Sequence, residues 1–148
     1  MEGTKEFRMI INSVHIVIGL YLLSLTNGLD MIPLLPDTPE EYKNSETHGY
    51  VLVVLGSLAF TQIIRIMKNY KARGGSLKGY FENITYWDVI HMVHLLVSGP
   101  LIVLLGLSRI GKFDAIDQET FKSLSFRVGG GLILYHSVRM VMHSMEKA

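Results

Sequence analysis

The sequence predicts an all-α integral membrane protein: one antiparallel four-helix bundle over residues 1–148, with both termini in the cytoplasm. Its apolar residues come in four runs of about 20, the length a helix needs to cross a hydrocarbon core of about 30 Å. Polar segments with glycine, proline or charged residues separate these runs. A soluble bundle would instead spread its apolar residues along amphipathic stripes, so the modest mean hydropathy of +0.31 conceals four apolar spans.

The first two spans are predicted at residues 8–28 and 48–67. Asn27-Gly28 ends the first span, and three prolines after it prevent the helix from continuing. Thr47 is the expected N-cap of the second span. The three prolines lie in the acidic segment between the spans, as Pro33, Pro36 and Pro39.

The last two spans are predicted at residues 86–107 and 124–145. Tyr86 and Trp87 begin the third span, where the aromatic belt of a membrane interface is expected. Gly99-Pro100 is expected to kink this span near its middle. A basic, glycine-containing loop precedes the third span, and a short mixed loop precedes the fourth.

The distribution of lysine and arginine between the loops predicts the orientation of the spans. With the N-terminus in the cytoplasm, nine of these residues lie on the cytoplasmic side and five on the far side. This asymmetry favours a multi-pass protein of the cell (cytoplasmic) membrane whose acidic first loop faces outward. The cytoplasmic set is Lys5, Arg8, Arg65, Lys68, Lys71, Arg73, Lys78, Arg139 and Lys147, and the far set is Lys43, Arg109, Lys112, Lys122 and Arg127.

The composition excludes several kinds of site and partner. Because the chain has no cysteine, it cannot form disulfides, thiolate zinc sites, iron–sulfur clusters or covalently attached haem. A net charge of +1 without a basic tract predicts no nucleic-acid partner. The first apolar run is too long for a signal peptide, and no cleavage site follows it. Haem held by histidine remains compatible with the composition.

The six histidines are the strongest functional signal, because each lies in a span or at its end. At about 1.5 Å per residue, five of them fall in the inner half of the bundle and one lies at the outer end of the second span. Ionisable groups at such depth are costly, so they usually face the bundle interior and serve a function. The inner histidines are His15, His91, His94, His136 and His143, and the outer one is His48.

Inner histidines on neighbouring helices suit a haem with two histidine ligands. Each imidazole gives one nitrogen to the iron from opposite faces of the porphyrin, and apolar helices enclose the ring. His136, Arg139 and His143 share one face of the fourth span, because they are 3, 4 and 7 residues apart. Arg139 or Arg8 would neutralise a haem propionate by bidentate hydrogen bonding.

Simpler interpretations stay open beside the haem. A histidine within a membrane is often only a hydrogen-bond partner between helices. His91 and His94, three residues apart, could instead line a quinone pocket or bind copper or zinc, with Asp88 orienting His91. His48, at the water interface, could simply be solvated.

All four spans resemble those of the prokaryotic membrane cytochrome b family. This family includes the bacterial b561 type and the b-type subunits of formate dehydrogenase and nickel–iron hydrogenase. The first span resembles the family through His15 and its exit at Asn27-Gly28. The matching stretches of the later spans are HGYVLVVLGSLAFTQIIRI, HMVHLLVSGPLIVLLG and LILYHSVRMVMH.

The family has two haems, but this chain departs from that pattern, so one haem b, or a descendant without haem, fits better than two. The inner iron would be held by His15 with His136 or His143. An outer haem would begin with His48, but Lys122 or Gly129 stands where the family has its second outer ligand. The implied function is to anchor a membrane redox complex in the lipid bilayer and to pass electrons between a partner subunit and quinone.

A haem-free function competes with this one. The chain shows no nucleophile triad, phosphate loop or complete catalytic constellation, so a catalytic role of its own is not expected. A small protein of four plain spans also fits an accessory subunit of a membrane oxidase or monooxygenase complex. A transporter is less favoured, because no pair of broken helices or internal repeat is present.

Overall fold

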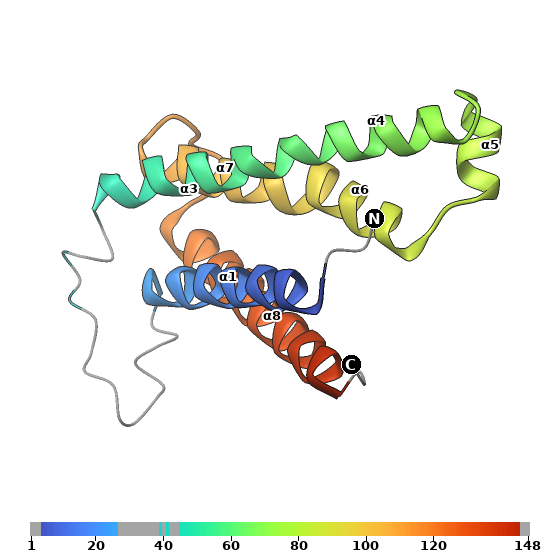
Figure 1. The fold of residues 1–148 in the computed structure, drawn as a ribbon. Helices are drawn as coiled ribbons and strands as arrows, with labels where there is room; N and C mark the ends of the chain where they lie inside the picture. The colour runs from blue at the N-terminus through green and yellow to red at the C-terminus, as the bar shows by residue number, and fades with distance from the viewer. Residues whose placement is uncertain (1–3, 27–38, 40, 42–44, 146–148) are drawn as a thin grey trace. The chain divides into compact units, whose positions relative to one another are not determined.

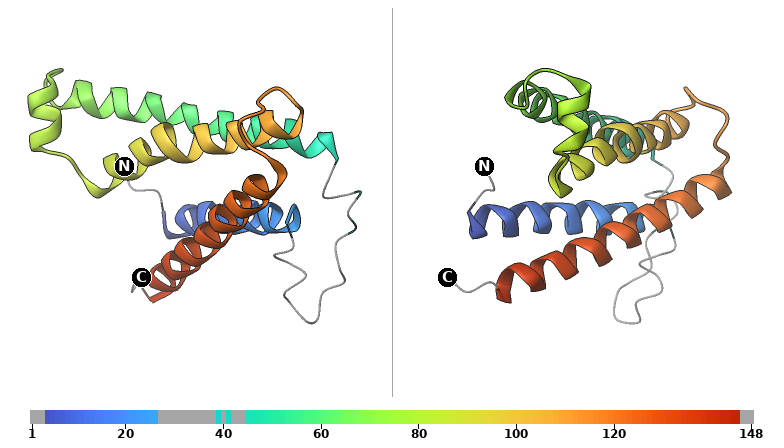
Figure 2. Two further views of the ribbon diagram at one scale, coloured as in Figure 1. Left: turned by 180° about the vertical axis from the view of Figure 1, so that it is seen from behind. Right: turned by 90° about the vertical axis from the view of Figure 1, so that its right-hand side faces the viewer.

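The computed structural model describes residues 4–26, 39, 41 and 45–145, and those residues form helices and turns without any strand (Figure 1). The chain divides into two compact units, Met1–Ser45 with Asp117–Ala148 and Glu46–Ile116. Each unit contains two long helical segments packed side by side, and the two are described separately (Figures 1 and 2). The all-α prediction is therefore confirmed, whereas a single four-helix bundle remains a prediction.

The first unit is an antiparallel pair of helices, α1 (Lys5–Ser24) and α8 (Gln118–Met145). The Thr4 side chain caps α1 by accepting a hydrogen bond from the amide of Phe7. At the same end of the pair, Lys5 Nζ donates to the carbonyl of Ser144 over 3.3 Å.

Two glycines allow α1 and α8 to approach closely. A methyl group added to Gly19 would lie 2.8 Å from the carbonyl oxygen of Gly129, and one added to Gly129 would lie 2.8 Å from that of Gly19. Buried residues on both helices recur at the seven-residue interval of coiled-coil packing. They are Asn12 and Gly19 on α1 with Thr26 just beyond its end, and Gly129, His136 and His143 on α8.

The second unit contains two long helical segments joined by a short helix. One is continuous through α3 (Glu46–Leu58), η1 (Ala59–Thr61) and α4 (Gln62–Ala72). The other is continuous through α6 (Tyr86–Val93), η2 (His94–Ser98) and α7 (Gly99–Arg109). Between them lies α5 (Leu77–Glu82).

Glycine also sets the packing of α3 against α7, again at seven-residue intervals. Gly49 faces Gly106, and a methyl group on Gly49 would lie 2.9 Å from the Gly106 carbonyl oxygen. Gly56 faces Gly99, with a corresponding distance of 2.8 Å. Both glycine pairs are buried, so the two backbones touch directly at two levels.

A turn of π-helix precedes Gly99-Pro100, where a kink is expected. In η2 the amide of Gly99 donates to the carbonyl of His94, five residues earlier. Proline has no amide hydrogen and cannot continue the regular bonding pattern, so the helix widens over the turn before it.

Three helical segments of the described chain are long and apolar enough to cross a membrane: Lys5–Ser24, Glu46–Ala72 and Tyr86–Arg109. Membrane insertion is thus supported for three of the four predicted spans. The helix α8 has 28 residues and is long enough, but it does not share their apolar composition. Its place as a fourth span, and the orientation of the termini, remain predictions.

The predicted boundaries need several corrections. The first helix begins at Lys5 rather than at residue 8, and the second continues to Ala72 rather than ending at residue 67. Thr47 is not an N-cap, because the helix already begins at Glu46. The basic segment predicted as a loop contains the end of α4 and the whole of α5. Asn27-Gly28, Pro33 and Pro36 lie outside the described residues.

The adjacent glycines Gly129 and Gly130 provide a matched test of the α1–α8 contact. We expect Gly129→Ala to destabilise the protein by about 1–3 kcal/mol, because the new methyl group would press on the backbone of α1. Gly130→Ala should be neutral or stabilising by at most about 1 kcal/mol, because nothing lies within 4 Å of the added carbon. Unfolding in detergent followed by circular dichroism measures both, and equal effects would contradict this packing.

Candidate functional site

The first candidate site is a polar layer inside the α1–α8 pair. The rings of His15 and His136 are stacked, with centroids 4.2 Å apart and planes 23° from parallel. His136 Nδ1 lies 2.7 Å from the Asn12 side-chain oxygen, and both residues are buried. His15 Nδ1 lies 2.7 Å from the carbonyl of Ile11. With Nδ1 donating in both rings, Nε2 is the unprotonated nitrogen of each neutral imidazole.

This geometry does not fit a haem ligated by His15 and His136. Two axial histidines lie on opposite sides of a porphyrin and point their nitrogens at the iron between them. The rings of His15 and His136 instead contact each other face to face, so no porphyrin fits between them. His143 lies about 10 Å further along α8 than His136, the residue on which His15 stacks, so His15 and His143 are not at one level of the pair.

The histidines of the second unit are not placed as two axial ligands of one haem either. His91 and His94 lie on one continuous helical segment, in α6 and η2. His48 lies in the first turn of α3, next to Gly49. Gly49 contacts Gly106, which is 12 residues beyond His94, or about 18 Å along the axis. His48 is mostly buried rather than solvated. Among the described residues, neither unit by itself therefore places two histidines on opposite sides of a porphyrin ring.

The face predicted for α8 is present in part. His136 and His143 are buried, and Arg139 between them is half-buried. These three residues do share one side of the helix, as their spacing predicts. The role of Arg139 with a propionate remains a prediction.

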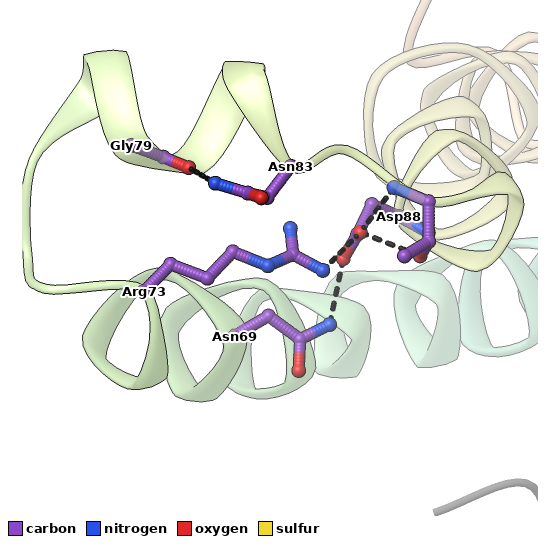
Figure 3. Close-up of polar contacts among 6 residues, drawn as sticks. Asn69, Arg73, Gly79, Asn83 and Asp88 are labelled. Atoms are coloured by element: carbon purple, nitrogen blue, oxygen red, sulfur yellow. Dashed lines mark hydrogen bonds and ion pairs between the residues drawn. The ribbon is translucent and has the colours of Figure 1, made fainter.

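A second candidate site surrounds Asp88, whose side chain is fully buried at the start of α6 (Figure 3). Arg73 Nη2 donates to this carboxylate over 2.7 Å, and Asn69 Nδ2 donates over 2.6 Å. The Thr85 amide donates to it over 2.8 Å and the Asp88 amide donates to the Thr85 hydroxyl oxygen over 3.3 Å, which together form the capping box of α6. The Thr85 hydroxyl also donates to the carboxylate over 2.6 Å. The carboxylate thus joins the end of α4 to the beginning of α6.

An aromatic side chain from α5 joins this cluster. The guanidinium of Arg73 lies 5.1 Å from the centroid of the Tyr80 ring, a cation–π contact. The Tyr70 ring lies near as well, with its centroid 6.4 Å from that of Tyr80. Burial raises the pKa of the Tyr80 phenol, and the negative charge of Asp88 raises it further.

The prediction that Asp88 orients His91 is wrong. The carboxylate oxygens of Asp88 accept hydrogen bonds from Asn69, Arg73 and Thr85. His91 Nε2 instead lies 3.4 Å from Arg65 Nη1. Within the described residues no group of three or more histidine or carboxylate side chains could hold a metal ion, so copper or zinc at His91 and His94 gains no support.

The Asp88 cluster was missed from the sequence, although part of its signal was readable. Thr85-x-x-Asp88 before an apolar run is a capping-box pattern. Nothing in the sequence indicates that Asn69 and Arg73, from the end of α4, would reach the same carboxylate.

Comparison with known proteins found no match to a family model, a curated protein or a solved structure. The resemblance to the membrane cytochrome b family therefore remains a prediction.

We expect Asp88→Ala to destabilise the protein by about 3–5 kcal/mol, because Arg73 would be left without its buried partner. Glu82→Ala is the matched control, since that exposed carboxylate makes only an ion pair of 3.9 Å with Lys78. Its effect should stay below about 1 kcal/mol. Denaturant titration of both variants measures the difference, and a mild effect of Asp88→Ala would mean that the network contributes little.

A double-mutant cycle tests the polar layer of the first unit. Asn12→Ala and His136→Ala should show a coupling free energy of about 0.6 kcal/mol, and at most about 1.7, as interhelical hydrogen bonds in membranes do. The control cycle uses Ser13→Ala and Met140→Leu, which remove an exposed contact of 3.8 Å. Zero coupling in the first cycle would show that the Asn12–His136 bond is not formed.

Proposed function

We propose that this chain is a multi-pass anchor subunit of the cell (cytoplasmic) membrane, serving an enzyme complex of the oxidase or monooxygenase type without a haem of its own. The observation that carries the proposal is the stacked pair of His15 and His136. His136 also forms a hydrogen bond with Asn12 across the pair, as polar side chains at helix–helix contacts in membranes do. The histidines then specify how α1 pairs with α8.

The exposed surface of the helices supports an anchoring role. Large apolar side chains remain outside each helix pair, where lipid or partner subunits would cover them. Examples are Val17 on α1, Val54 on α3, Ile64 on α4, Leu96 in η2 and Leu134 on α8. A subunit of this kind holds a larger complex in the bilayer through its surface and needs no catalytic group.

A b-type cytochrome subunit is the second candidate, and one observation favours it. His15 Nδ1 and His94 Nδ1 each lie within 2.8 Å of a main-chain carbonyl, the arrangement that orients a ligating histidine and leaves Nε2 for the metal. When bound, haem would carry single electrons to or from quinone. This function requires the rings of His15 and His136 to separate, or each histidine to bind the haem iron together with a different residue.

An absorption spectrum of the purified native protein, or of its complex, before and after dithionite decides between the two. The anchor proposal predicts no Soret band and no reduced α-band from this chain. It also predicts that His15→Ala and His136→Ala lower the yield of assembled complex. A reduced α-band near ~560 nm that is lost in His15→Ala would overturn the proposal and establish a histidine-ligated cytochrome.

A further inference from the structure

The short helix α5 presents a face that the fold does not use. Leu77 and Phe81 are four residues apart on one side of this helix, and 68% and 57% of their surfaces are exposed. Tyr80, by contrast, is only 3% exposed and packs near Arg73 and Tyr70. The buried tyrosine therefore determines which way α5 is turned, and Leu77 and Phe81 point away from the unit.

The ends of α5 are secured by their own side chains. Ser76 caps its beginning by accepting a hydrogen bond from the amide of Gly79 over 3.0 Å. At its end Asn83 Nδ2 donates to the carbonyl of Gly79 over 3.0 Å (Figure 3). A helix held in this way is a defined element, so the exposure of its apolar side chains is not a consequence of fraying.

The position of α5 along the chain places it beside a membrane surface. It connects Glu46–Ala72 to Tyr86–Arg109, two segments long enough to cross a bilayer, so it lies where both of them leave it. Three exposed lysines accompany it, against the single exposed acid Glu82. Arg73 adds no free charge, because Asp88 neutralises it. The exposed lysines are Lys68, Lys71 and Lys78.

We propose that α5 is an interfacial anchor that binds the surface of an anionic bilayer. Leu77 and Phe81 enter the boundary between headgroups and acyl chains, and the lysines contact phosphate groups of the lipids. Apolar side chains flanked by lysine are the pattern of helices that lie in this boundary, and each lysine near an anionic surface adds to the attraction. The occupant of this face is thus the lipid surface itself.

Single cysteines test the proposal cleanly, because the chain has none. Nitroxide labels are placed at Leu77→Cys, Phe81→Cys and the control Glu82→Cys, and the full-length protein is reconstituted into vesicles of phosphatidylcholine and phosphatidylglycerol. Electron paramagnetic resonance should show labels 77 and 81 more accessible to oxygen than to a water-soluble nickel chelate. Label 82 should show the reverse preference.

The lipid charge is tested with the same labels. In vesicles of phosphatidylcholine alone, or with both Lys71→Gln and Lys78→Gln, the oxygen preference at positions 77 and 81 should fall severalfold. Nickel access exceeding oxygen access at all three positions in anionic vesicles would overturn the proposal, since α5 would then face water or a protein partner. A preference independent of lipid charge would overturn the role of the lysines.

A second measurement covers variants that reconstitute poorly. The same three cysteines are reacted with a membrane-impermeant maleimide in anionic vesicles, where position 82 should react severalfold faster than positions 77 and 81. Equal rates at the three positions would contradict the proposal. Neither experiment depends on whether the protein binds haem.

Discussion

Direct contact between helix backbones is the constraint on which both helix pairs depend. At Gly19–Gly129, Gly49–Gly106 and Gly56–Gly99 the carbonyl of one helix occupies the space that a side chain would need on the other. In a bilayer, lipid tails are as apolar as leucine, so burial of apolar surface does not drive the helices together. Close packing and hydrogen bonds must do so, and glycine makes the close packing possible.

The same close approach explains why polar side chains can be buried in these pairs. In the α1–α8 pair the position seven residues after Gly129 is His136, and the position seven before Gly19 is Asn12. These two side chains meet where the next glycine layer would be, and they bond to each other over 2.7 Å. A polar layer at one defined level fixes the register of two helices, because any shift would leave both groups without a partner.

The sequence was sufficient to predict the helices but not their partners. The lengths of the apolar runs placed three candidate spans within a few residues of their observed positions, because membrane thickness sets that length. The pairing of Asp88 with Arg73 depends on helix rotation, which packing determines and no local pattern encodes. The histidines show the same limit: their spacing along each helix was readable from the sequence, but the stacking of His15 on His136 was not.

That limit bears on how histidine-rich membrane sequences are interpreted. Histidines at one level of neighbouring helices satisfy two of the conditions for binding a haem: the type of ligand and its level along the helix axes. The third condition is the separation of the two rings, and the close glycine contact at Gly19–Gly129, about two turns from His136, works against it. A helix pair cannot readily hold its backbones in contact at one level and admit a porphyrin between them two turns away. In this chain the glycines therefore argue against haem within the α1–α8 pair more strongly than the histidines argue for it.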